Sequence, residues 1–158
     1  MTRVALALLA TLAGCAEPTA LLVFVDSDMP LERVTVEVTG SDEVTAPTST
    51  TMDFAAAPRP ARLTLVPDGT HIIGDAVEVE VKGYLAGAAT EAVDRTAVTR
   101  FVDGETRFIQ VYLFEACAGV ECDVEGETCV ADADTAVGDC ESESLNAQPY
   151  ADDPPRIE

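Results

Sequence analysis

Valines alternate with polar residues in two separate stretches of the chain, and this period of two is the feature that most constrains the fold. Residues 33–39 place three valines on one face and four polar residues on the other, and residues 77–82 repeat the alternation. Residues 61–65 show it more weakly. Because successive side chains of a β-strand point to opposite faces, each stretch is expected to form a strand with one buried face.

Two further regions are predicted to form strands of other kinds. Residues 21–25 are apolar on both faces, which indicates a strand covered on both sides or one that meets the C-terminal part of the chain. Residues 48–54 are expected to form an edge strand with Met52 and Phe54 facing inward.

The sequence also contains a strong hairpin signal. Residues 95–102 and 106–114 are separated by Asp103-Gly104-Glu105. Asp-Gly favours a tight turn because both residues accept a positive φ angle. The two flanking stretches are therefore expected to pair with each other as neighbouring strands.

These patterns predict an all-β domain over residues 20–115. About seven strands, separated by regularly spaced turn signals, are typical of an antiparallel β-sandwich. The expected architecture is immunoglobulin-like or transthyretin-like, and a closed barrel is the alternative. Aromatic residues make up only 5% of the chain, so the core must be built mainly from aliphatic side chains.

The first residues have the pattern of an export signal. Arg3 gives a positive start, residues 4–12 are an apolar run, and Ala13 and Gly14 are small residues that suit a peptidase. As a helix the run would span roughly 14 Å, far short of the roughly 30 Å hydrocarbon layer of a bilayer. The run is therefore not expected to be a transmembrane helix.

The motif Leu12-Ala13-Gly14-Cys15 resembles the lipobox of bacterial lipoproteins. The resemblance implies a signal peptide over residues 1–14, diacylglycerol on the Cys15 thiol, and often a fatty acyl chain such as palmitate on the new amino group. Two or more chains give lasting membrane attachment. Residues 15–19 would then be the lipid anchor and a short tether. In this family an Asp after the Cys favours retention in the inner membrane, so Ala16 implies the outer membrane.

The C-terminal part of the chain differs in composition from the strands. After residue 115 the chain has many acidic residues and one basic residue, Arg156, and the apolar alternation stops. A short segment with so little apolar content needs covalent staples to fold. With Cys15 set aside for the lipid, four of the five cysteines remain, and an even number in an exported chain predicts disulfides, here two in a Cys-rich knob over residues 116–141. Residues 142–158 are expected to be a disordered acidic tail.

The knob contains four cysteines, which allow three disulfide pairings, and their spacing does not choose among them. They are Cys117, Cys122, Cys129 and Cys140. A zinc site is the competing interpretation, because four thiolates satisfy tetrahedral coordination. The gaps between these cysteines do not fit the tight Cys pairs that usually hold zinc, so no metal is expected there.

The cysteine spacing resembles the small EGF-like hairpin that opens follistatin-type modules. The resemblance implies the pairs Cys117–Cys129 and Cys122–Cys140. The lipobox, short β-rich body and Cys-rich end together resemble the uncharacterised surface lipoproteins that some bacteria encode in large numbers. That resemblance implies no activity.

Acidic residues near the third and fourth cysteines suggest a calcium site, but the pattern is incomplete. Asp132 and Asp134 have further acids nearby at Asp139, Glu141 and Glu143. Calcium needs six to eight oxygen ligands in a preformed turn. An EF-hand would need an oxygen ligand at Ala136 and a glycine at Val137, so a solvated loop is the favoured interpretation.

No residue pattern indicates catalysis. His71 is the only histidine, and it follows a Pro-Asp-Gly turn where exposure to solvent is expected. The sequence has no nucleophile elbow, metal-binding His pair or phosphate loop. Phe108, Tyr112 and Phe114 share one face of a predicted strand and suggest a ligand platform, although cover by the second sheet or by the N-terminal strand is favoured.

The net charge of −20 excludes a basic surface for nucleic acid or anionic headgroups. The sequence therefore predicts a lipid-anchored extracytoplasmic binding or structural module of the bacterial cell envelope, without catalytic activity or cofactor. Its expected partners are the membrane, through the lipid on Cys15, and an unidentified protein or glycan. The alternative is a small lipid-anchored hydrolase or an accessory subunit of an envelope enzyme.

Overall fold

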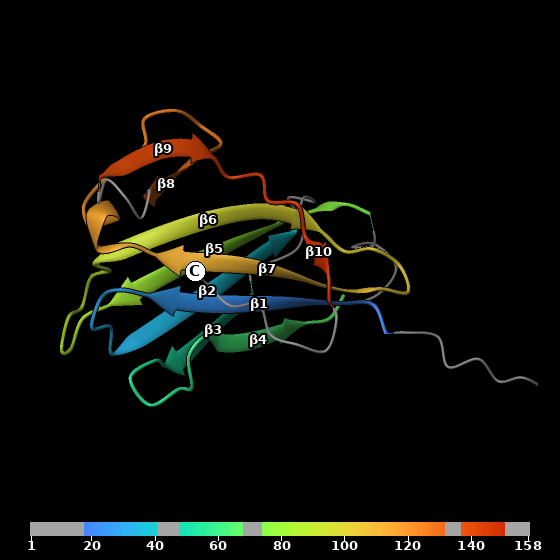
Figure 1. Ribbon diagram of the computed structural model, residues 1–158, viewed down its shortest axis with the longest axis horizontal. Coiled ribbons are helices and arrows are strands. Elements are labelled where there is room, and N and C mark those ends of the chain that lie inside the picture. The colour runs from blue at the N-terminus through green and yellow to red at the C-terminus, as the bar shows by residue number, and fades with distance from the viewer. Residues whose placement is uncertain (1–17, 41–47, 68–73, 132–136, 151–158) are drawn as a thin grey trace, which may run out of the picture.

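The computed structural model describes residues 18–40, 48–67, 74–131 and 137–150. Two four-stranded sheets face each other, and a two-stranded knob lies beside one edge of the pair (Figure 1). The predicted β-sandwich is confirmed. Cys15 and His71 lie outside the described residues.

The second sheet carries the strands with the clearest alternation. Its order is β3 (Thr48–Asp53), β2 (Arg33–Gly40), β5 (Ala76–Tyr84) and β6 (Val93–Arg100), and every neighbouring pair is antiparallel. The alternating valines point into the sandwich, as the period of two predicts. Five of them are fully buried: Val34, Val36, Val77, Val79 and Val81.

The first sheet is ordered β10 (Gln148–Pro149), β7 (Thr106–Leu113), β1 (Ala20–Ser27) and β4 (Ala61–Leu65). Strand β1 lies between β7 and β4 and is buried along nearly its whole length, which explains its continuous apolar run. The pair β1–β7 is parallel, whereas the other pairs of this sheet are antiparallel.

The predicted hairpin over residues 95–114 is wrong. Strand β6 pairs with β5 in the second sheet, and β7 pairs with β1 in the first. The turn itself forms, with Gly104 at φ 68° and the Glu105 amide donating to the Val102 carbonyl over 3.2 Å. Asp-Gly therefore fixes a tight turn here, but this turn joins the two sheets instead of two neighbours in one sheet.

The knob follows β7 directly. A short 3-10 helix, η1 (Glu115–Cys117), leads to the antiparallel pair β8 (Glu127–Ala131) and β9 (Gly138–Ser142). The knob contacts the core, because Cys117 and Cys129 belong to the same cluster of buried residues as the strands of the sandwich.

The segment 143–150, which we call the C-terminal strap, runs back over the sandwich and differs from the predicted disordered tail. The Val98 amide donates to the Glu143 carbonyl and the Leu145 amide donates to the Val98 carbonyl, each over 2.8 Å. The strap then pairs with β7 through β10. Backbone hydrogen bonds to the edges of both sheets hold this polar segment, although it lacks apolar alternation. Residues 151–158 of the predicted tail lie outside the described residues.

The opposite side of the sandwich is formed by β3 and β4. Each pairs with a single neighbour among the described strands, β2 and β1 respectively, so the two sheets do not close into the alternative barrel. The predicted edge strand over residues 48–54 is thus confirmed. Phe54, just after β3, is fully buried in the core, as predicted.

Candidate functional site

The knob is held by two disulfides, Cys117–Cys129 and Cys122–Cys140, with Cα–Cα distances of 5.7 and 5.8 Å. This is the pairing that the resemblance to follistatin-type modules implies. The sulfurs are bonded to each other and are not free thiolates, so the zinc interpretation is wrong. Cys117 and Cys129 belong to the core cluster of the sandwich, whereas Cys122 is only partly buried against it.

Strand β6 contacts the knob through a backbone amide and the first sheet through a side chain. The Thr96 amide donates to Thr128 Oγ1 over 3.0 Å, and Thr128 is buried. Arg95 extends in the other direction and donates to the Tyr112 carbonyl over 3.2 Å. Burial lowers the pKa of the Arg95 guanidinium, and the carboxylate of Glu141 on β9 partly offsets this effect. The knob is therefore an extension of the folded body.

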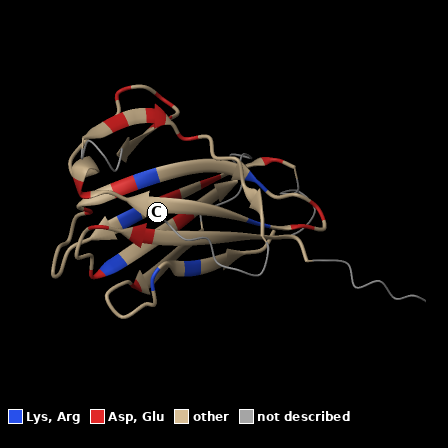
Figure 2. Cartoon of the chain, viewed as in Figure 1, with Lys and Arg blue, Asp and Glu red and all other residues tan. Residues whose placement is uncertain are grey.

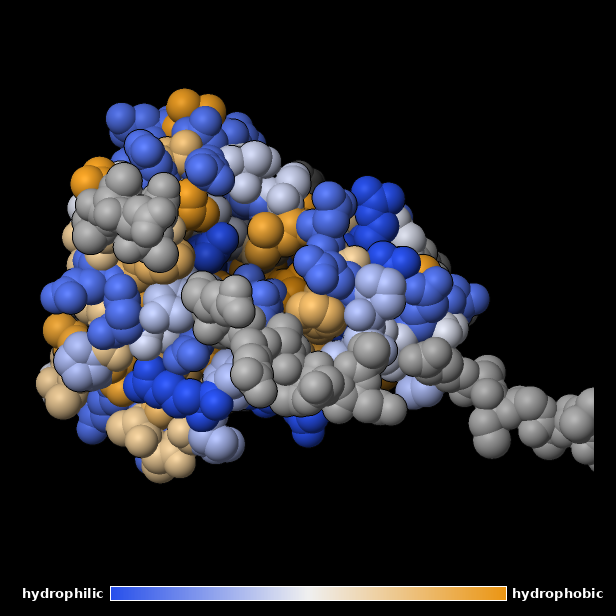
Figure 3. All heavy atoms as spheres, in the orientation of Figure 1, coloured by the Kyte–Doolittle hydropathy of each residue, from blue (hydrophilic) through white to orange (hydrophobic). Residues whose placement is uncertain are grey.

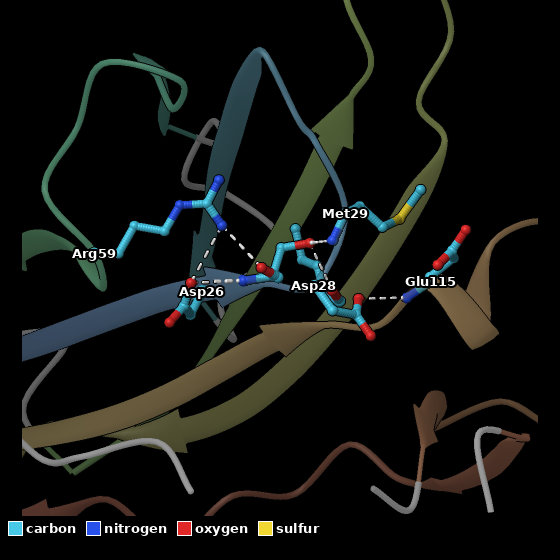
Figure 4. A network of polar contacts seen from close by, with 7 residues as sticks. Asp26, Asp28, Met29, Arg59 and Glu115 are labelled. Atoms are coloured by element: carbon cyan, nitrogen blue, oxygen red, sulfur yellow. Dashed lines mark hydrogen bonds and ion pairs between the residues drawn. The ribbon is translucent and has the colours of Figure 1, made fainter.

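Figure 4 shows a network of polar contacts at the end of β1. Arg59 donates to the Ser27 carbonyl over 2.8 Å and pairs with Asp26 at 3.4 Å. The Asp28 carboxylate accepts the Glu115 amide at 2.7 Å. These contacts join the end of β1 to the segment before β4 and to the start of η1.

The one serine at the centre of this network is structural. The Ser27 hydroxyl donates to the Leu113 carbonyl over 2.7 Å and accepts the Met29 amide over 3.0 Å. The residue is buried, and no basic side chain lies in hydrogen-bond contact with its Oγ among the described residues. A nucleophilic serine needs an adjacent general base, so this geometry does not support catalysis at Ser27.

The aromatic residues predicted on one face of β7 lie on the outer face of the first sheet, and the strap covers part of them. The Phe108 ring lies 6.1 Å from Phe24 and 6.3 Å from Tyr150, both edge to face. Tyr112 packs against Phe114 with ring centroids 4.5 Å apart. Where described residues form this face, hydrophobic side chains show as small areas among hydrophilic ones (Figure 3). Tyr150 of the strap thus covers Phe108, and Phe24 of the N-terminal strand lies beside it. The expected cover by the second sheet is wrong, because β7 turns Ile109, Val111 and Leu113 toward that sheet and the aromatic residues away from it.

The outer face of the second sheet carries a row of carboxylates that the sequence interpretation did not single out. Glu37 and Glu80 are register partners on β2 and β5, and Lys82 lies between them at 3.9 and 2.7 Å. Burial, with Glu80 and Glu91 nearby, raises the pKa of Asp94. Figure 2 shows acidic residues in red along several strands of the sandwich and in the knob. The signal was present in the sequence, because the polar residues that alternate with the buried valines include Glu37, Glu78 and Glu80.

The first residue of the strap, Glu143, adds to this acidic surface. Burial raises the pKa of Glu143, and repulsion from Glu78 and Glu125 raises it further. Asp132 and Asp134 of the suggested calcium loop lie outside the described residues. Within the described part, no group of three or more His, Cys, Asp or Glu side chains could hold a metal ion.

The described residues line shallow cavities without a catalytic arrangement. One of about 200 Å³ lies between β6 and the strap and includes Arg100, Arg107 and Ser144. Another of about 270 Å³ lies between β6 and the knob and includes Asp94, Glu121 and Thr128. Neither places a serine or a free thiol beside a histidine or a carboxylate.

No helix among the described residues has the length and hydrophobicity needed to cross a bilayer. Comparison of the chain with models of known protein families, with curated proteins and with solved structures found no match.

Proposed function

We propose that this chain is a lipid-anchored extracytoplasmic module that binds a partner or serves a structural role, and that Cys15 carries the lipid. The observation that carries the proposal is the pair of closed disulfides in the knob, Cys117–Cys129 and Cys122–Cys140. Disulfides form and persist in oxidising compartments outside the cytoplasm. They therefore favour the same destination as the lipobox residues Leu12-Ala13-Gly14-Cys15, by an independent route.

The start of the sandwich suits a short tether. Strand β1 begins at Ala20, so the chain between Cys15 and the first strand can span at most about 18 Å. Thr19 is already fixed, because its hydroxyl oxygen accepts the Gly104 amide over 2.8 Å. With Cys15 in a bilayer, this end of the sandwich would lie at the membrane surface, and the opposite end, at Asp28 and η1, would point away.

Charge supports the lipid as the means of attachment. The net charge of −20 repels anionic headgroups and nucleic acid, so electrostatic adsorption cannot hold the chain on a membrane. A covalent anchor needs no basic surface. The membrane that fits best is the bacterial outer membrane, because Ala16 stands where an Asp would favour inner-membrane retention.

The described surface supports binding or structural roles more than catalysis. The buried hydroxyl of Ser27 is used inside the fold, and the cavities at the knob and the strap are small and open. Rigid sandwiches commonly present edges, faces and loops to protein or glycan partners. We therefore assign the partner to one of these two classes.

Substitution of the anchor tests the proposal. The change Cys15→Ser removes the only thiol that the lipobox offers and leaves the disulfide cysteines intact. We expect this variant to remain a full-length precursor without incorporated fatty acid, measured by metabolic labelling with palmitate and by mass spectrometry. The matched control is Ala16→Ser, which should be processed and labelled as in the wild type. A labelled, processed Cys15→Ser protein in the membrane fraction would overturn the proposal.

A further inference from the structure

Two arginines line one cavity near the end of the sandwich where β1 begins. Arg100 is the last residue of β6 and Arg107 lies in β7, and the turn at Gly104 joins these two strands. The Gly104 amide donates to Thr19 Oγ1, just before β1. The cavity has a volume of about 200 Å³, and the strap forms its other wall.

Hydrogen bonds hold the walls of this cavity in place. The Leu145 amide donates to the Val98 carbonyl over 2.8 Å and so fixes the strap beside β6. Arg107 donates from Nη1 to the Ala147 carbonyl and from Nε to Glu105, each over 2.9 Å. A guanidinium has five N–H groups, so these two bonds orient Arg107 and leave further donors for another acceptor. The cavity is therefore formed before any ligand enters.

The lining of the cavity is unusual for such an acidic chain, because none of the described residues in it carries a carboxylate. Half of the ten lining residues are apolar, and the other five have side chains that donate hydrogen bonds: Thr99, Arg100, Arg107, Ser144 and Asn146. Arg100 takes part in no ion pair among the described residues. A ligand cation would find no acid in this lining, whereas arginine binds carboxylates through parallel hydrogen bonds. The lining therefore favours a ligand with a carboxylate.

The size and the mixed character of the lining narrow the ligand further. A cavity of roughly 150 Å³ holds benzene, so this cavity has room for one six-membered ring with small substituents. Its apolar half suits the C–H groups of such a ring, and Ser144 and Asn146 suit ring hydroxyls. An inorganic anion would leave the apolar half without contacts. A sugar acid has all three features: a ring, hydroxyls and a carboxylate.

We propose that this cavity binds one carboxylated sugar unit, such as glucuronate, at the end of a glycan. The carboxylate would lie against Arg100 and Arg107. The net charge of −20 repels anions at long range, so a polymer of many acidic units is disfavoured. A single acidic unit gains from the two arginines because it reaches them at contact distance.

A second cavity adjoins the first and favours a glycan over a free sugar acid. Both cavities are lined by Leu145 and Asn146. The second has a volume of about 150 Å³, and its lining adds Phe108, Gln110 and Gln148 without a charged side chain. A ring face and side-chain amides suit the next, uncharged sugar unit. This step rests on the proposed function, since it selects the glycan from the two classes of partner named there.

Isothermal titration calorimetry of the full purified chain tests the need for a carboxylate. The probe is the methyl glycoside of glucuronate, in which the methyl group stands for the rest of a glycan, and the matched probe is the methyl glycoside of glucose. We expect the glucuronate glycoside to bind at least about tenfold more tightly. Equal affinities, or no heat of binding from either compound, would overturn the proposal.

Three further ligands test the sugar and its source. Cyclohexanecarboxylate has the ring and the acid without hydroxyls, and inorganic phosphate has the charge without the ring. Each should bind at least about tenfold more weakly than the glucuronate glycoside, and equal binding by either would overturn the assignment of a sugar. Binding of free glucuronate without binding of its methyl glycoside would overturn the assignment to the end of a glycan.

Two variants with the same charge change locate the site. Arg100→Gln removes a guanidinium from the cavity, and Arg62→Gln removes one from β4, outside the cavity; both arginines are exposed. Arg100→Gln should weaken binding of the glucuronate glycoside by about tenfold or more, whereas Arg62→Gln should leave it unchanged. An equal loss in both variants would mean that only net charge matters, which also overturns the proposal.

The binding measurement does not depend on lipidation. An unlipidated Cys15 in a chain that binds the glucuronate glycoside would therefore contradict the proposed anchor alone. A lipidated chain that binds neither glycoside would contradict the sugar site alone.

Discussion

The hydroxyl of Ser27 links the end of β1 to two backbone groups at a buried position, where water cannot replace a lost hydrogen bond. It donates to the Leu113 carbonyl and accepts the Met29 amide, at a buried position. Ser27→Ala would leave both groups without this bond. We expect the free energy of unfolding to fall by about 1–3 kcal/mol, measured by urea denaturation.

Ser49→Ala is the matched control for this change. Ser49 lies on β3 and is exposed, so its hydroxyl can exchange protein contacts for water. The control should change the free energy of unfolding by no more than about 0.5 kcal/mol. An equal loss of stability in both variants would show that the two hydrogen bonds of Ser27, drawn in Figure 4, stabilise the fold no more than an exposed hydroxyl does.

At the scale of elements, the two disulfides are expected to protect different parts of the molecule. Cys122–Cys140 closes a separation of 18 residues at the outer part of the knob. Replacing both cysteines by alanine should lower the stability of the knob by about 3 kcal/mol, because the open loop regains conformational entropy. Amide exchange should therefore accelerate in β8 and β9 while β2 and β5 keep their protection.

The inner disulfide provides the comparison. Cys117 and Cys129 are buried in the core cluster, so replacing this pair by alanine removes core packing together with the cross-link. Exchange should then accelerate in the sandwich strands as well as in the knob. If the outer pair lowered the protection of β2 and β5 as much as the inner pair does, the knob and the sandwich would unfold as one cooperative unit.

The strands themselves were predictable from the sequence, but their neighbours were not. A period of two identifies the buried face of β2 and β5, because side-chain direction is a local property. It does not identify which strand lies alongside. The Asp103-Gly104 turn forms as predicted, yet the strands that it joins lie in different sheets, because pairing with β5 and β1 decides their position.

The strap was missed for a related reason. Residues 143–150 are polar and short of apolar alternation, so composition predicted disorder. Backbone hydrogen bonds to Val98 and pairing with β7 hold the segment instead, and such bonds leave no side-chain pattern. The disulfide pairing followed from a resemblance, because four cysteines alone allow three pairings. Cys15, His71 and the acids at 132–134 lie outside the described residues, so the predictions made for them stay predictions.

At the scale of the whole molecule, acidic residues dominate the surface and should make stability depend on pH. The pKa of Asp94 is raised above 3.8 and that of Glu143 above 4.5, in both cases mainly by burial and then by neighbouring carboxylates. A carboxyl whose pKa is raised in the folded state binds protons more tightly there than in the unfolded chain. Its contribution to stability is therefore largest below the ordinary pKa and is lost as the pH rises through the raised value.

Thermal unfolding at a series of pH values measures this dependence. The midpoint temperature should rise as the pH falls from neutral toward the pKa values of Asp94 and Glu143, and high salt should weaken the effect by screening the repulsion. The double variant Asp94→Asn, Glu143→Gln should show a flatter pH profile. The control double variant Glu115→Gln, Asp123→Asn makes the same charge change at exposed positions and should keep the slope of the wild type. If both double variants flattened the dependence of the midpoint temperature on pH equally, the net charge of the protein would explain that dependence. The burial of Asp94 and Glu143 would then make no separate contribution.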